Sequence, residues 1–221
     1  MLWHTLDVPS DLTSQLDELA HRFGTPVIQN IVLELPNFAM PLADHETALP
    51  VGGLFAPLGK GDRYGEVCMV VRRTDGTLIT ARKIYYPKQA FRLLTGGISH
   101  GETIYDALLR ETHEETGLDV AVREFLAAVS YRVTGELAPL FYTFAFLLDE
   151  VGGTLGAIDE QEQVEDFGFV LPEELPAMAT TLEQLSGDDP HEIAGSWGDW
   201  GKFRAVTHRL VAQKVAMRTE D

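Results

Sequence analysis

Residues 96–118 read GGISHGETIYDALLRETHEETGL, and this stretch decides how the rest of the chain is interpreted. It opens with two glycines, Gly96 and Gly97, which we expect to form a loop. A helix is predicted from Thr103 to Thr116, and Gly117 stands where a glycine commonly ends a helix. The sequence therefore predicts a glycine loop that leads into one short helix.

The second half of this helix is rich in carboxylates. Glu111, Glu114 and Glu115 are spaced i, i+3 and i+4, so their side chains share one helix face. Such like-charge pairs destabilise a plain helix by roughly 0.2–0.5 kcal/mol each. A sequence that tolerates this repulsion offers the carboxylates to a cation, and hard oxygen ligands suit Mg²⁺ or Mn²⁺. A solvated acidic face is the alternative for a lone pattern of this kind.

The complete segment resembles the Nudix box, G-x5-E-x7-R-E-U-x-E-E-x-G-U, in which U is aliphatic. The one departure is Thr112, at the first aliphatic position, where its β-branched side chain is expected to pack in place of a residue such as Val. The residues that fall in register are Gly96, Glu102, Arg110, Glu111, Glu114, Glu115, Gly117 and Leu118.

The resemblance implies a fold, an activity and a set of roles. The fold class would be α/β (α+β), a Nudix α/β/α sandwich with a mixed β-sheet. The activity would be Mg²⁺-dependent hydrolysis of a diphosphate linkage in a nucleotide-like substrate, with Mn²⁺ as a substitute. Glu102 would assist near the loop and Arg110 would hold the glutamates in place. The expected metal ligands are Gly96 through its carbonyl, Glu111, Glu114 and Glu115.

Many members of this family also use a carboxylate from a loop well after the box. The acidic run from Asp159 to Glu165 occupies the corresponding place. Glu162 is the first candidate for a base or an extra metal ligand, followed by Glu160, with Glu165 also open. For each of them, a solvated loop charge is the alternative.

Residues outside the box are expected to choose the substrate. Arg82, Lys83 and Arg92 are candidates to bind its phosphates, with ordinary surface solvation as the alternative. Trp197 and Trp200 could stack on a base, although packing in the core or in a dimer interface is the favoured interpretation. No subfamily marker is convincing, so ADP-ribose, a nucleotide sugar and a (d)NTP all remain open.

The flanking sequence predicts alternating strands and helices. Residues 1–60 are expected to form an N-terminal extension with a helix at 9–23, a strand at 28–35 and a loop-rich arm, which either mediates a homodimer or covers the site. Residues 61–221 are expected to form the Nudix hydrolase domain. Its predicted strands are 66–73, 77–83, 91–94, 122–133, 140–148 and 167–171, and its predicted helices are 103–116, one opening at Pro172, and 203–218.

Charge and composition limit the partners and the location. The formal net charge of −17 argues against general binding to a nucleic acid duplex or an anionic membrane. The charge is also uneven: residues 133–201 contain fifteen acidic residues and no Lys or Arg. The sequence predicts neither a transmembrane helix nor a secretory signal, and the single Cys68 fits a reducing compartment. A small-molecule partner and a cytoplasmic location are therefore expected.

Two other functions compete with the hydrolase. A non-catalytic Nudix-like sensor of nucleotides would be expected to lose the box glutamates, which this chain keeps. An isoprenoid diphosphate isomerase would need a reactive cysteine near the site, whereas Cys68 stands in an apolar strand pattern and is expected to be buried.

Overall fold

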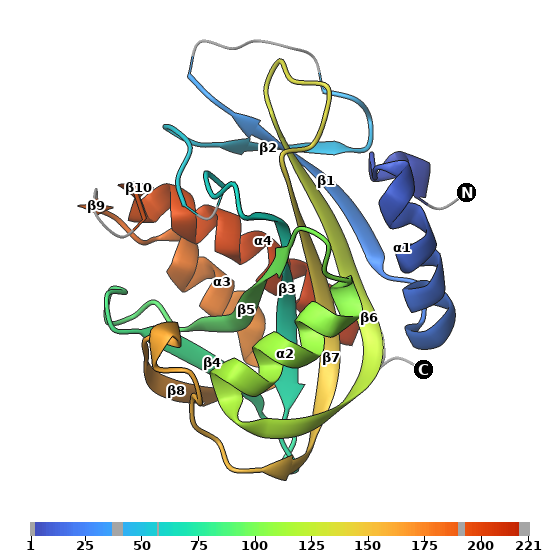
Figure 1. Cartoon of the computed structure of the whole chain (residues 1–221). Coiled ribbons are helices and arrows are strands. Elements are labelled where there is room, and N and C mark those ends of the chain that lie inside the picture. The colour runs from blue at the N-terminus through green and yellow to red at the C-terminus, as the bar shows by residue number, and fades with distance from the viewer. Residues whose placement is uncertain (1–2, 37–41, 57, 190–192, 217–221) are drawn as a thin grey trace.

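A mixed eight-stranded sheet forms the centre of the protein in a computed structural model, which describes residues 3–36, 42–56, 58–189 and 193–216 (Figure 1). The spatial order of the strands is β2-β1-β6-β7-β3-β5-β4-β8. The strands are β1 (Val27–Glu34), β2 (Glu46–Pro50), β3 (Arg63–Arg72), β4 (Leu78–Lys83), β5 (Arg92–Ser99), β6 (Leu118–Val133), β7 (Phe141–Gly153) and β8 (Val164–Val170). The pairs β1–β2, β1–β6 and β3–β7 are parallel, and the others are antiparallel.

Helices cover both faces of this sheet. The helices are α1 (Ser10–Phe23), α2 (Ile104–Thr116), α3 (Leu175–Glu183) and α4 (Trp197–Ala216). Three 3₁₀ turns, η1 (Trp3–Thr5), η2 (Glu160–Glu162) and η3 (Pro172–Glu174), and a small β9–β10 ladder (Asp188–Asp189 and Gly195–Ser196) complete the described elements. One buried cluster joins α1 and α2 to the sheet, and a second joins α3 and α4 to its other face. The expected α/β/α sandwich is confirmed.

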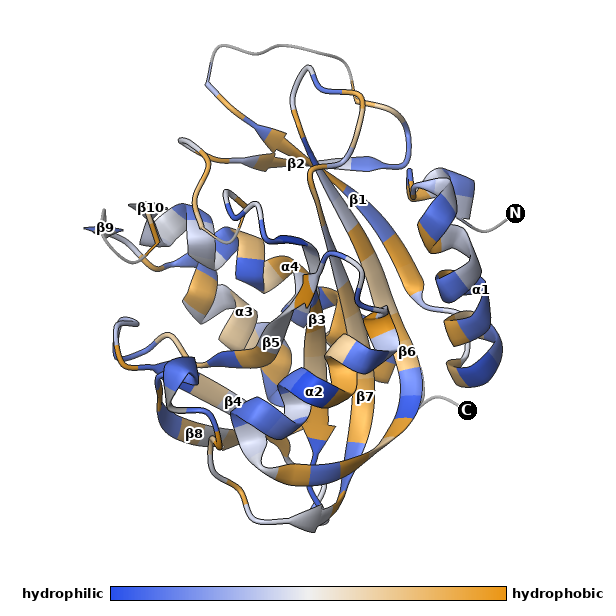
Figure 2. Cartoon of the chain, viewed as in Figure 1, coloured by the Kyte–Doolittle hydropathy of each residue, from blue (hydrophilic) through white to orange (hydrophobic). Residues whose placement is uncertain are grey.

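The alternation of side chains along β7 supplies both clusters. Phe144, Phe146 and Leu148 pack with α1 and α2, while Ala145 and Leu147 face α3 and α4. Successive side chains of a strand point to opposite faces, so a central strand covered on both sides is apolar throughout. Figure 2 shows this apolar character along β3, β6 and β7, with hydrophilic residues on the outer side of α2.

The structure corrects three local predictions. The predicted loop-rich arm contains the strand β2. Its sequence does not indicate a strand, because β2 has only five residues, ends in a proline and pairs only with β1. Helix α1 starts at Ser10 rather than at residue 9, because Pro9 is its N-cap residue and has an extended backbone. The C-terminal helix starts at Trp197 rather than at residue 203, because Trp197 and Trp200 pack into the core and belong to its first turns.

The N-terminal residues share the sheet with the rest of the chain. Strand β1 pairs with β6 from Val27–Ala127 to Leu33–Val133. The predicted division into an extension of residues 1–60 and a domain of residues 61–221 stays a prediction. No helix in the described part of the chain is long and apolar enough to cross a membrane.

Candidate active site

Helix α2 packs against strand β5 and places the predicted carboxylates next to it. Thr103 begins the helix, with its hydroxyl accepting a hydrogen bond from the Asp106 amide at 3.1 Å. Gly117 follows the last turn with a φ of 65°, as the sequence predicts. Thr112 fills the aliphatic position without loss of packing, because its side chain is buried and its hydroxyl donates to the Leu108 carbonyl at 2.6 Å.

The two glycines of the segment lie in strand β5, not in a loop. They pair with β3, in the registers Glu66–Gly97 and Val67–Gly96. A Cβ atom at Gly96 would overlap the Glu111 side chain, and one at Gly97 would overlap the Arg63 guanidinium. The absence of side chains therefore lets these two charged groups lie directly on the strand, which is a close approach rather than a turn.

Arg110 ties the carboxylates of the box together. It donates from Nε to Glu102 at 2.7 Å, and from Nη1 to Glu111 at 2.8 Å and Glu114 at 2.9 Å. Its Nη2 also reaches the Gly97 carbonyl at 3.1 Å. These charge-assisted bonds raise the pKa of Arg110, chiefly through Glu102, and hold three acidic side chains in one arrangement. The positioning role expected for Arg110 stays a prediction.

Glu115 is the most deeply buried of the candidate glutamate ligands, with 1% of its surface exposed. Burial raises its pKa to about 7, against the opposing charges of Lys83 and Arg92. Lys83 lies 3.5 Å from Glu115 Oε1 and donates to Glu162 at 2.9 Å. Among the described residues, Glu115 Oε1 is buried without a hydrogen-bond partner.

These carboxylates fit a divalent cation. Oxygens of Glu111, Glu114 and Glu162 all lie within 4.8 Å of one another. Together with the unpartnered Glu115 oxygen, they form a set of hard oxygen donors of the kind that Mg²⁺ and Mn²⁺ prefer. The fold brings Glu162 to the three helix glutamates from the loop before β8. Glu165 instead pairs with Arg82 and is exposed, and the Glu160 side chain lies outside the described part.

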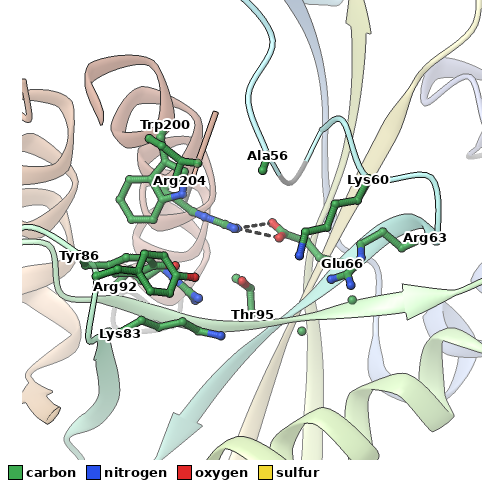
Figure 3. A pocket seen from close by; sticks show the side chains of 14 residues that line it. Ala56, Lys60, Arg63, Glu66, Lys83, Tyr86, Arg92, Thr95, Trp200 and Arg204 are labelled. Atoms are coloured by element: carbon green, nitrogen blue, oxygen red, sulfur yellow. Dashed lines mark hydrogen bonds and ion pairs between the residues drawn. The ribbon is translucent and has the colours of Figure 1, made fainter. Parts of the chain in front are cut away.

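A polar cavity of about 110 Å³ lies on the other side of the glycine pair, between β5 and α4 (Figure 3). Of the predicted phosphate-binding residues, Lys83 and Arg92 line this cavity. Arg82 does not, because its guanidinium pairs with Glu165 and lies over the Phe91 ring. Trp197 and Trp200 are buried in the core, which is the first of the two kinds of packing favoured for them, and Trp200 also borders the cavity.

The residues that complete this cavity are not among those predicted from the sequence. Lys60 and Arg63 lie before the box, and Arg204 lies far beyond it, in helix α4. Arg204 donates to both carboxylate oxygens of Glu66 at 2.7 Å, and both side chains are buried. Nine of the seventeen Lys and Arg residues lie between Lys60 and Arg110, and this enrichment is the one sequence signal for Lys60 and Arg63. Nothing in the sequence pairs Arg204 with Glu66.

His208 fixes helix α4 to strand β5 next to this cavity. Its Nε2 accepts a hydrogen bond from the Leu93 amide at 3.0 Å, and its Nδ1 lies 2.8 Å from the Arg204 carbonyl. A neutral ring protonated on Nδ1 satisfies both contacts. Burial lowers the pKa of His208 to about 4, with a smaller contribution from the charges of Arg92 and Arg204.

Acidification is therefore expected to weaken the fold through His208. The unfolded chain takes up this proton near pH 6.5 and the folded chain only near pH 4. The unfolding free energy should consequently fall by about 1 kcal/mol between pH 7 and pH 5.5, with no further loss from this group below pH 4. Urea unfolding of the wild type and of His208→Gln at both pH values measures this difference. An equal pH response in the two proteins would show that another group is responsible.

Comparison with known proteins gives three kinds of match. The family model described as NUDIX domain matches residues 63–189. Over 119 residues the chain is 30% identical to an ADP-ribose pyrophosphatase of Methanocaldococcus jannaschii, which covers 54% of this chain and 68% of that protein. Over 73 residues it is 36% identical to an RNA pyrophosphohydrolase of Cereibacter sphaeroides, covering 33% of this chain and 45% of that protein.

Solved structures also show a likeness. An Ap4A hydrolase of Caenorhabditis elegans aligns with a TM-score of 0.46 and 14% identity, over 72% of this chain and 99% of that one. An ADP-ribose pyrophosphatase of Streptococcus suis aligns with a TM-score of 0.40 and 13% identity, over 67% and 89% of the two chains.

Proposed function

Because the chain belongs to the NUDIX domain family of hydrolases, we propose that it cleaves a diphosphate linkage in a nucleotide-like substrate and uses Mg²⁺, or Mn²⁺ in its place. One observation carries this proposal: the carboxylate cluster on α2 and the cationic cavity meet at the same pair of glycines. A diphosphate placed over Gly96 and Gly97 has carboxylates on one side, as ligands for cations, and positive side chains on the other.

The proposed roles follow from the contacts. Glu111, Glu114 and Glu115 hold the divalent cation, with the Gly96 carbonyl as a further ligand. When bound there, the cation offsets the charge of the diphosphate and lowers the pKa of an attacking water. Glu162 serves as the base or as an extra ligand.

Two residues of the box orient the ligands rather than bind the substrate. Arg110 bonds to Glu102, Glu111 and Glu114, so it keeps the carboxylates aimed at one point before a cation arrives. Glu102 holds Arg110 in turn with both of its oxygens, and one of these also accepts from the Ser99 amide at 3.2 Å. The box thereby links the end of β5 to helix α2.

The names of the two relatives favour a nucleotide derivative as the substrate class, and ADP-ribose, nucleotide sugars and (d)NTPs all belong to it. The isomerase alternative requires a reactive thiol. Cys68 does not provide one, because it is buried and burial raises its pKa to about 12. A small-molecule partner without a nucleic acid duplex or a membrane, a cytoplasmic location and a homodimer stay predictions.

A product-release screen with Mg²⁺ tests this function. The panel contains ADP-ribose, nucleotide sugars, dinucleoside polyphosphates, coenzyme A and nucleoside triphosphates, each assayed for phosphate-containing products. We expect turnover of one class, its loss on addition of EDTA and its return with excess Mg²⁺. Turnover that persists in EDTA would contradict the metal site. If no compound of the panel is hydrolysed and Mg²⁺ or Mn²⁺ still raises the Tm, the nucleotide sensor would be favoured.

A further inference from the structure

The cavity beside the glycine pair is strongly cationic in a protein of net charge −17. Among the described residues that line it, Glu66 is the only carboxylate. The cationic residues of its wall are Lys60, Arg63, Lys83, Arg92 and Arg204. Figure 3 shows four of these side chains, those of Lys60, Lys83, Arg92 and Arg204, around Thr95.

Two of these cations are buried and incompletely paired. Arg92 is 3% exposed, donates to the Tyr86 hydroxyl at 3.2 Å and to the Leu93 carbonyl at 2.7 Å, and forms no ion pair with a carboxylate in the described part of the chain. Arg204 has its ion pair with Glu66, but among the described residues its buried Nε has no partner. Buried charge of one sign is unfavourable unless an opposite charge compensates it, so this wall is suited to an anion.

The size of the cavity restricts that anion. A volume of about 110 Å³ is several times the roughly 10–15 Å³ that a cavity needs to hold one water. It falls well short of the roughly 300–1,000 Å³ of pockets that enclose a whole drug-sized ligand. The cavity can therefore take a compact group such as a phosphate, and it is too small for a nucleoside.

Lys83 connects the cavity to the carboxylate cluster. Its side chain borders the cavity, and its ammonium group lies 2.9 Å from Glu162 and 3.5 Å from Glu115. Gly96 likewise borders the cavity while its other side meets Glu111. An anion in the cavity is thus a close neighbour of a diphosphate held at the cluster.

We propose that this cavity is a subsite for a terminal phosphate of the substrate, bound by Arg92, Arg204 and Lys60. The proposal rests on the proposed function and narrows its substrate class. The favoured substrates carry a phosphate beyond the scissile linkage, as nucleoside triphosphates do, and not a neutral sugar at that end. Lys60 and Arg204 both lie outside residues 63–189, so segments flanking the NUDIX match provide this selectivity.

Binding of inorganic pyrophosphate in EDTA tests the subsite without catalysis. Lys60→Met is the main variant, because Lys60 is exposed and its loss should leave the fold intact. Calorimetry should show wild-type binding that is weakened about tenfold in Lys60→Met. The matched control is Lys88→Met, an exposed lysine outside the cavity lining, which should bind as the wild type does. Equal binding by all three proteins, or none by the wild type, would overturn the proposal.

A kinetic comparison then separates this proposal from the proposed function. We expect kcat/KM to be higher for ATP than for ADP-ribose, and Lys60→Met to lower it more for ATP than for ADP-ribose. The double variant Glu66→Gln/Arg204→Gln, which removes both members of the ion pair, should reduce the preference in the same direction. Hydrolysis of ADP-ribose in preference to ATP, with the same loss for both in Lys60→Met, would refute the subsite and leave the hydrolase intact. Pyrophosphate binding that depends on Lys60, without hydrolysis of any compound, would support the subsite and contradict the proposed hydrolase function.

Discussion

Glu115→Gln is expected to lower kcat/KM for diphosphate hydrolysis on the order of 10³-fold. The substitution keeps the shape of the side chain and removes its ability to carry a negative charge. Glu115 is the buried member of the carboxylate cluster, and one of its oxygens has no hydrogen-bond partner among the described residues. Loss of that charge removes a proposed ligand from the place where the diphosphate charge has to be offset.

The stability of the same variant identifies the cause of the lost activity. In EDTA the buried carboxylate of Glu115 is unfavourable, as its raised pKa of about 7 indicates, so the glutamine should leave Tm unchanged or raise it. The rise in Tm on addition of Mg²⁺ should disappear. Glu173→Gln, at an exposed position on η3, is the control and should behave as the wild type in both assays. A Glu115→Gln protein with full activity would exclude this residue from the metal site.

The second large effect is expected at the buried ion pair of Glu66 and Arg204. Glu66→Gln should reduce the free energy of unfolding by about 3 kcal/mol, because it leaves the Arg204 guanidinium buried beside a neutral amide. Thr143 also donates to Glu66 at 3.0 Å, so the substitution disturbs a second polar contact. Denaturant unfolding in the absence of divalent cations measures the loss.

Two further variants separate buried charge from simple loss of a contact. Glu66→Gln/Arg204→Gln should recover a substantial part of the stability, since neither charge then remains. Glu183→Gln breaks the ion pair with Arg209, which is also on α4 but is 45% exposed, and should change stability by less than about 1 kcal/mol. A Glu66→Gln protein as stable as Glu183→Gln would indicate that water in the cavity solvates Arg204.

The residues of the box could be predicted from sequence because their arrangement is local. Glu111, Glu114 and Glu115 share a face of one helix, and helical spacing alone establishes this. The sandwich was also predictable, since strands such as β7 are apolar throughout and need helices on both faces. Cys68 illustrates the same point: its apolar strand pattern predicts burial, and the structure confirms it.

The cavity could not be predicted, because its residues meet only through the tertiary fold. Glu66 and Arg204 are 138 positions apart, and no periodic pattern relates them. The glycines of β5 were assigned to a loop because glycine is common in turns. Their actual role is to let Glu111 and Arg63 contact the backbone, and that role depends on side chains from α2 and β3. Sequence spacing describes a single element well, and it contains little information about which elements become neighbours.

The distance along the chain between Glu66 and Arg204 also has a consequence for biosynthesis. A ribosome that adds about 5–20 residues per second needs roughly 7–28 s to advance the 138 positions from Glu66 to Arg204. During that interval the central strand β3 carries a carboxylate without its guanidinium partner, and the face of the sheet that α4 covers remains exposed. The nascent protein therefore cannot complete its cavity before α4 has been synthesised and released, and until then the exposed apolar surface favours aggregation.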